Sequence, residues 1–115
     1  EKPRLNVFRS LKNIYAQVTG GYKISEPAAN LGIMMAIASS CKNKPIDNQT
    51  VFIGEVGLTG EIKPASQMVR RLKESDRMGF KKAYIAKGSI EPNLTLQNLE
   101  VVEVSTVKEL LEKIF

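Results

Sequence analysis

A run of apolar residues, Leu31 to Ala38, most restricts the folds that this chain can adopt. Ser25 is a suitable N-cap, with Glu26 and Pro27 in the first turn, for a helix that reaches about Ser40. Because the interior of this helix is apolar on nearly every side, it belongs in the middle of a fold. Small residues would let neighbouring elements approach it closely; they are Ala28, Ala29, Gly32, Ala36 and Ala38. We therefore expect this helix to be the central element.

Helical and strand-like patterns alternate along the rest of the chain. The expected elements are helices at 4–11, 66–78 and 106–114, strands at 13–18, 51–53, 83–86 and 99–104, and a glycine-rich hairpin at 54–64. Gly79 is placed to end the second of these helices. Ser105 or Thr106 would cap the last one, with Glu109 at capping-box spacing from Thr106. Strands that alternate with helices predict an α/β (α+β) fold.

The composition is that of an ordinary globular domain. The chain has 115 residues, 43% of them hydrophobic, which is enough for one domain over residues 1–115 with residues 1–12 as a lead-in. It has no histidine and one cysteine, which excludes histidine-based catalytic triads and the usual zinc sites. Cys41 sits inside an apolar run, so we expect a small buried thiol, and a lone cysteine favours a reducing, cytoplasmic compartment. No apolar run is long enough to span a membrane, so we expect no membrane association.

Three blocks of sequence occur in a characteristic order. They are Glu26 to Leu31, the glycine-rich block Gly54 to Ile62, and Arg71-Leu72-Lys73-Glu74 followed by Gly79 to Ala83. Together they resemble the C-terminal domain of the bacterial RadA (Sms) family of DNA-recombination proteins, from about residue 13 to the end. The resemblance implies that the chain is the C-terminal fragment of a longer protein. The connection from Phe8 to Asn13 is shorter than the one usual in that family.

The RadA C-terminal domain is itself similar to the proteolytic domain of Lon, which has a two-layer, ribosomal-protein-S5-domain-2-like fold and a serine–lysine dyad. By motif, Ala28 stands at the serine position and Arg71 at the lysine position, with the same spacing as in Lon. Alanine has no nucleophile, and an arginine, with a pKa above roughly 12, cannot act as the base. Ile53 also replaces a threonine, and Ser66-Gln67 replaces two glycines. The resemblance therefore implies a degenerate dyad without peptidase activity; a Lon-type ATP-dependent serine peptidase domain is the alternative.

The same resemblance implies partners and cofactors. It implies an ATP-driven helicase that assembles into a ring, expected to be a hexamer, and acts in homologous recombination and branch migration. We therefore expect this domain to serve ring assembly and DNA binding. The chain has neither a phosphate-binding loop nor a four-cysteine zinc motif. ATP, Mg and Zn are thus expected in upstream regions of the full-length protein, with no cofactor and no metal ligand in this domain.

The net charge of +5 favours a polyanionic partner such as DNA. The residues expected to contact DNA phosphates are Arg70, Arg71, Lys73, Arg77, Lys81, Lys82 and Lys87. The alternative is a solvated helix face on which Glu74 and Asp76 are interleaved with the cations. Arg71 is also a candidate for a buried arginine paired with Glu55 or Glu61.

Glu55 and Glu61 flank the glycines of the glycine-rich block and could be mistaken for a catalytic carboxylate pair. No histidine and no metal motif accompanies them, so we favour solvation or bracing of the hairpin as their role. We expect the glycines to adopt positive φ in turns rather than to bind a phosphate.

Overall fold

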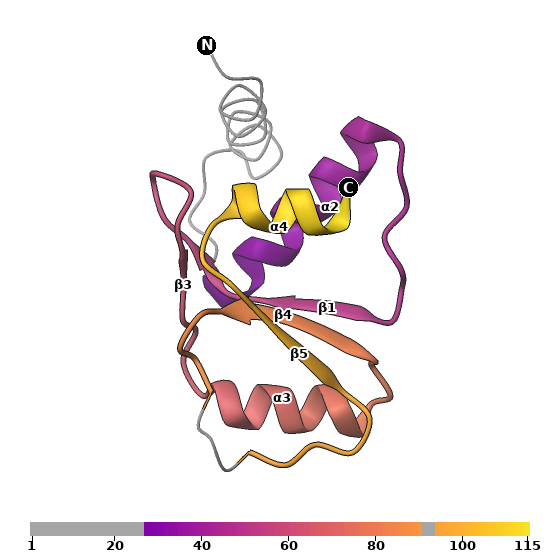
Figure 1. The fold of residues 1–115 in the computed structure, drawn as a ribbon, viewed down its shortest axis with the longest axis vertical. Helices are drawn as coiled ribbons and strands as arrows, with labels where there is room; N and C mark the ends of the chain where they lie inside the picture. The colour runs from indigo at the N-terminus through magenta and orange to yellow at the C-terminus, as the bar shows by residue number, and fades with distance from the viewer. Residues whose placement is uncertain (1–26, 91–93) are drawn as a thin grey trace.

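The computed structural model describes residues 27–90 and 94–115. Within these ranges a parallel sheet has the order β1 (Thr50–Ile53), β4 (Lys82–Ala86) and β5 (Glu100–Val104). Helices α2 (Asn30–Lys42) and α4 (Val107–Ile114) lie on one face of this sheet, and α3 (Met68–Arg77) lies on the other (Figure 1). The predicted α/β class, with helices packed against a sheet, is confirmed. The elements expected at 4–11 and 13–18, and the Ser25 cap, lie outside the described residues.

Strand β4 is buried on both sides. Tyr84 and Ala86 pack with α2 and α4, whereas Ala83 and Ile85 pack with α3. This division follows from strand geometry, because successive side chains point to opposite faces of a sheet. The fold therefore has two cores, one on each face, and both include β4.

Helix α2 is less enclosed than its sequence predicted. Its buried residues are Leu31, Met34, Met35 and Ala38, which recur at the spacing of one helix face. Gly32, Ile33 and Ile37 are half-buried and Ala36 is exposed. The expectation of a central, fully enclosed helix is wrong: α2 covers one face of the sheet, with Ala36 exposed on its outer side.

Cys41 is exposed, so the expectation of a buried thiol is also wrong. It lies in the last turn of α2, where Ser40, Cys41 and Lys42 are all exposed. In Figure 1 this end of α2 projects beyond the sheet that covers its earlier turns. The helix ends at Asn43, whose backbone is left-handed at φ 52°.

The glycine-rich block forms the predicted hairpin. Strands β2 (Glu55–Val56) and β3 (Ile62–Lys63) are antiparallel, with Val56 opposite Ile62. The hairpin is fixed to the rest of the fold by two backbone bonds, from the Ile62 amide to the Ser105 carbonyl and from the Val107 amide to the Gly60 carbonyl, both 2.9 Å.

The end of α3 follows its sequence signal closely. Gly79 ends α3 with φ 93°, and the amides of Gly79 and Phe80 donate to the carbonyls of Asp76 and Ser75 at 3.2 and 3.1 Å. These bonds form a Schellman motif, which needs a left-handed residue at this position.

The start of α4 carries a reciprocal cap. The Thr106 hydroxyl accepts from the Glu109 amide at 3.1 Å, and the Glu109 carboxylate accepts from the Ser105 amide at 2.8 Å. The predicted capping by Thr106 and Glu109 is confirmed. None of the helices in the described part of the chain has the length and apolar character that crossing a membrane requires.

Candidate functional site

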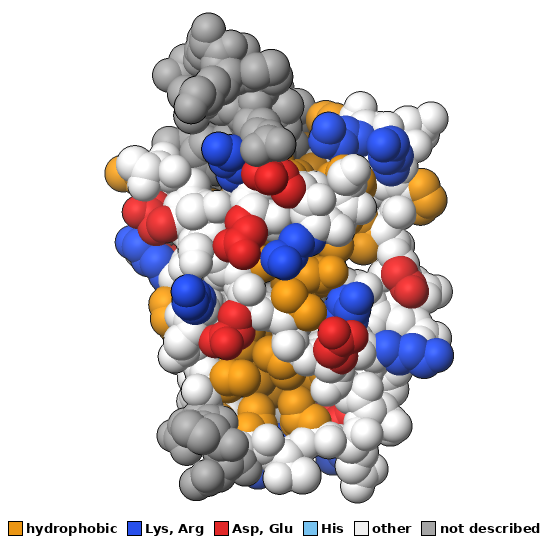
Figure 2. Space-filling view, viewed as in Figure 1, with side chains coloured by type: hydrophobic (Ala, Val, Ile, Leu, Met, Phe, Trp, Pro, Cys, Tyr) orange, Lys and Arg blue, Asp and Glu red, His pale blue; other side chains and the backbone are white. Residues whose placement is uncertain are grey.

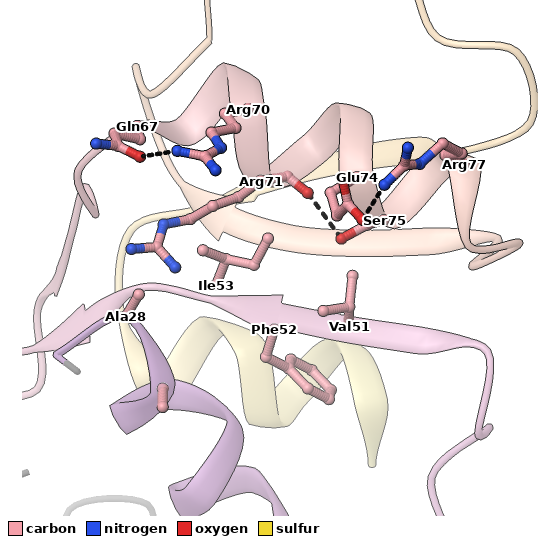
Figure 3. A pocket seen from close by; sticks show the side chains of 11 residues that line it. Ala28, Val51, Phe52, Ile53, Gln67, Arg70, Arg71, Glu74, Ser75 and Arg77 are labelled. Carbon is pink, nitrogen blue, oxygen red and sulfur yellow. Dashed lines mark hydrogen bonds and ion pairs between the residues drawn. The ribbon is translucent and has the colours of Figure 1, made fainter.

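An open groove of about 690 Å³ lies between α3 and β1 (Figure 3). The 3-10 helix η1 (Pro27–Ala29) closes one end of its floor. The lining residues are Ala28, Ala29, Val51, Phe52, Ile53, Gln67, Arg70, Arg71, Glu74, Ser75 and Arg77. The floor from η1 and β1 is thus apolar, and the wall from α3 is polar and charged.

Ala28 is held beside the end of β1 by backbone hydrogen bonds. Its carbonyl accepts from the Gly54 amide at 3.1 Å, and the Leu31 amide donates to the Gly54 carbonyl at 3.2 Å. Gly54 has no room for a side chain, because a Cβ there would lie 2.9 Å from Cγ2 of Ile62. Ala28 is only 6% exposed and belongs to the core on the α3 face.

Arg71 reaches into the same groove from the opposite wall. Its Nε donates to the Ser66 carbonyl at 2.8 Å, and this bond directs the half-buried side chain across the groove toward the end of β1 (Figure 3). Ile53 lies on the floor and is 6% exposed. Ala28, Ile53 and Arg71, which the predicted resemblance to Lon assigns to its serine, threonine and lysine positions, therefore line one groove.

Gln67 precedes α3 in a left-handed backbone conformation, with φ 54° and ψ 43°. Its side-chain oxygen accepts from Nη1 of Arg70 at 3.3 Å. Side chains with a Cβ rarely adopt this conformation, whereas glycine adopts it without steric cost. Gln67 thus occupies a position suited to a glycine.

The residues predicted to contact DNA do not form one surface. Arg70, Lys73 and Arg77 are exposed on α3, where Arg77 is ion-paired with Glu74. Lys81 is exposed after the turn that ends α3. On the face shown in Figure 2, cations and carboxylates are interspersed rather than separated.

Lys82 and Lys87 are placed differently from the cations of α3. The Lys82 ammonium lies 3.9 Å from the Glu100 carboxylate on β5. Lys87 follows the far end of β4, roughly 16 Å from its start for a strand of this length. The structure therefore does not bring Lys87 together with Lys81 and Lys82.

Residues 19–89 match the family described as subunit ChlI of Mg-chelatase, and this match covers more than half of the chain. The chain belongs to the ChlI family. Within residues 27–90 and 94–115 of this ChlI-family chain, no group of three His, Cys, Asp or Glu side chains is arranged to hold a metal ion.

This ChlI-family chain is also similar to proteins named DNA repair protein RadA. The relative from Streptococcus pneumoniae is 39% identical over 104 residues, which are 90% of this chain and 25% of the relative. The relative from Streptococcus pyogenes serotype M3 is 40% identical over 104 residues, and that from Aquifex aeolicus is 40% identical over 109 residues, or 95% of this chain and 24% of the relative. The chain thus spans about a quarter of the length of these relatives. The predicted resemblance to RadA is confirmed, and the similarity to Lon stays a prediction.

Asp76 has a structural role in this ChlI-family chain that the sequence did not reveal. Its carboxylate accepts from the backbone amides of Gln97, Asn98 and Leu99 at 2.8, 2.8 and 3.0 Å. These hydrogen bonds, first that from Gln97, lower the pKa of Asp76 because they favour the charged form. Asp76 therefore fastens the segment before β5 to the end of α3.

Glu61 braces the hairpin, as predicted for one of the two flanking glutamates. The Thr59 hydroxyl donates to one carboxylate oxygen at 2.9 Å and the Thr59 amide to the other at 3.2 Å. The bond from the Thr59 hydroxyl is the largest of the effects that lower the pKa of Glu61. A Cβ on Gly57 would lie 1.8 Å from the same carboxylate, so this position has no room for a larger residue unless Glu61 moves.

Proposed function

We propose that this chain is a non-proteolytic, Lon-like domain of a cytoplasmic RadA-type DNA repair protein, which binds DNA and helps to assemble a hexameric ring. The observation that carries this proposal is the identity of about 40% to proteins named DNA repair protein RadA over 90% of the chain. Because the chain spans a quarter of those relatives, ATP hydrolysis with Mg and the binding of Zn would belong to other regions of the full-length protein.

The lining of the groove supports a non-proteolytic role. Position 28 offers a methyl group where acyl transfer needs a nucleophile, and the guanidinium of Arg71 does not release a proton near neutral pH. Ser75 also lines the groove, but its hydroxyl donates to the Arg71 carbonyl at 2.9 Å. A Ser75 nucleophile would need a neighbouring base, and the groove lining supplies arginines rather than lysine or histidine.

A serine-directed probe tests this part of the proposal. The chain is incubated with a fluorophosphonate and with an unfolded protein substrate, beside an active serine peptidase as positive control. We expect no labelled serine and no cleavage. Labelling at any serine, located by mass spectrometry, would contradict the proposal and favour the alternative of a Lon-type serine peptidase domain.

The outer face of α3 is the proposed contact for DNA phosphates. Arg70 and Lys73 are exposed there, and the exposed Lys81 follows the helix. Guanidinium and ammonium groups at such positions attract a polyanion and release its condensed counterions on contact. Arg71 is a weaker candidate because it faces the groove.

Duplex binding at several salt concentrations tests the DNA contact. The variant Arg70→Ala with Lys73→Ala is compared with Lys108→Ala with Lys113→Ala, which removes the same charge from exposed positions on α4, across the sheet. We expect the α3 variant to bind about tenfold more weakly and to have a salt slope smaller by about 2, with a change below about twofold in the control. Equal losses in both variants would contradict a contact at α3.

Ring assembly is tested in the full-length protein. We expect analytical ultracentrifugation to show a hexamer, and a smaller species when the region corresponding to this chain is removed. A truncated protein that still forms the hexamer would remove assembly from the function of this domain.

A further inference from the structure

The groove between α3 and β1 joins an apolar floor to a cationic wall. The side chains of Val51 and Ile53 point into it from β1, whereas Phe52 points to the other face of the sheet (Figure 3). Phe52 therefore lines the groove through its backbone. A ligand in this groove would contact apolar side chains and the main chain of a strand at the same time.

Arginines outnumber carboxylates among the side chains of the wall. It contains three arginines and one carboxylate, that of Glu74, which is ion-paired with Arg77. Arg70 is exposed, and its hydrogen bond to Gln67 uses one of the five N–H donors of a guanidinium. The wall is thus complementary to a ligand with negative charge, and arginine can bind a carboxylate through two parallel hydrogen bonds.

Within the described residues, β1 is at the end of the strand order and pairs with β4. An extended peptide that lies between this edge strand and α3 directs alternate side chains toward the arginines of α3 and toward Val51 and Ile53. Alternate side chains of such a peptide point to one side, roughly 7 Å apart. Arg70 and Arg77 lie two turns apart on α3, or roughly 10 Å along the helix axis, and their long side chains can reach carboxylates at that spacing.

We propose that this groove binds an extended peptide segment of a protein partner in which acidic and apolar residues alternate. Its carboxylates contact the arginines of α3, with Arg70 at the mouth of the groove. Its apolar side chains cover Val51 and Ile53. Arg70 is shared with the proposed contact for DNA, whereas Lys73 on the outer face of α3 is not part of the groove lining and separates the two proposals.

A peptide suits this groove better than a nucleic acid. A nucleic-acid strand would place its phosphates on the arginines, but its sugars and phosphates would also cover the side chains of Val51 and Ile53, which offer them no hydrogen bonds. Bases of single-stranded nucleic acids stack on aromatic side chains. The aromatic residue in the groove lining is Phe52, and its ring points away from the groove (Figure 3).

Fluorescence anisotropy with defined peptides tests the proposal. The probe is a fluorescein-labelled hexapeptide that alternates glutamate and valine. One control peptide replaces each glutamate by glutamine, and another replaces each valine by serine. We expect the 115-residue chain to bind the probe and to bind each control peptide about five- to tenfold more weakly, because each control loses one of the two kinds of contact.

Two protein variants locate the site. Arg70→Gln removes a charge from the groove, and Lys73→Gln removes the same charge from the outer face of the same helix. We expect about fivefold weaker binding of the probe for Arg70→Gln and less than a twofold change for Lys73→Gln. Val51→Thr changes the floor without changing charge, and it should weaken binding of the valine peptide but leave the serine peptide unaffected. Thermal unfolding confirms that each variant is folded.

Three results would overturn the proposal. One is a chain that does not bind the probe, and another is an equal loss for Arg70→Gln and Lys73→Gln, which would indicate unspecific attraction between charges. The third is a ten-nucleotide oligothymidine that displaces the probe at lower concentration than the unlabelled peptide does. That last result would assign the groove to single-stranded nucleic acid.

Discussion

Ala28 in η1 and Arg71 in α3 line the same groove, although 43 positions separate them in the chain. The hydrogen bond from Nε of Arg71 to the Ser66 carbonyl directs the arginine across this groove, and backbone bonds through Gly54 hold Ala28 at its floor. Side chains placed at these two positions therefore share one space.

The first prediction introduces a serine and a lysine at the two positions that the predicted resemblance to Lon assigns to its dyad. The double variant Ala28→Ser with Arg71→Lys should acquire slow labelling by a fluorophosphonate at position 28, because a hydroxyl and an amine that can lose its proton would then face the same groove. Either single change should leave the chain unlabelled. Mass spectrometry of the labelled chain measures the outcome, and labelling of the Ala28→Ser variant to the same extent as the double variant would exclude position 71 from the base role.

The second prediction concerns Gln67, which has a left-handed backbone. Replacement by glycine removes a steric cost of about 1–2 kcal/mol but makes the unfolded chain more flexible, so we expect a net gain in stability of about 0.5 kcal/mol. Gln67→Ala keeps the Cβ and loses the hydrogen bond with Arg70, so it should destabilise the chain. Urea unfolding measures both, and a glycine variant less stable than the alanine variant would contradict the explanation.

The third prediction is a dependence of stability on pH that arises at Asp76. Its pKa in the folded chain lies below the ordinary value because three backbone amides donate to the carboxylate. This contribution is therefore fully present above the unfolded pKa of about 3.9 and is lost as the pH falls through the lower, folded pKa. Asp76→Asn should lower Tm by roughly 5 °C at pH 7.

The difference in Tm between the two chains should shrink as the pH falls from about 5 toward 2. Glu74→Gln is the matched control, because it removes a charge from the same helix without touching the segment before β5. A constant difference across the pH range would show that the effect of the Asp76 substitution is unrelated to its titration.

The fourth prediction tests the bracing of the hairpin. Gly57→Ala places a methyl group at the position of the Glu61 carboxylate, which must then turn away from Thr59. We expect Tm to fall by roughly 5 °C and the amide protons of the hairpin to exchange faster. Glu61→Gln should reproduce part of the loss. If both variants melted like the unaltered chain, the hydrogen bonds of Glu61 would have no stabilising role.

The sequence predicted the features that depend on neighbouring residues. The end of α3 at Gly79, the hairpin at β2 and β3, and the cap formed by Thr106 and Glu109 each result from contacts within a few positions. Such signals are local, and they can be read before the fold is known.

Features that depend on distant contacts were not predictable in the same way. The partners of Asp76 lie 21 to 23 positions further along the chain. Cys41 is exposed because α2 extends past the sheet. The hydrophobic pattern of a helix does not show how long the neighbouring strands are. A common groove for Ala28 and Arg71 could be expected only from family resemblance, because no local pattern relates residues so far apart.

Strand β4 contributes two side chains to the core under α3 and two to the core under α2 and α4. Neither half of the molecule can open fully while the other keeps β4 in place, so unfolding should be a single cooperative transition. The amide protons of β4 should be the slowest to exchange with solvent. A ligand held in the groove would then slow exchange beneath α2 and α4 as well, on the side of the sheet that it never touches.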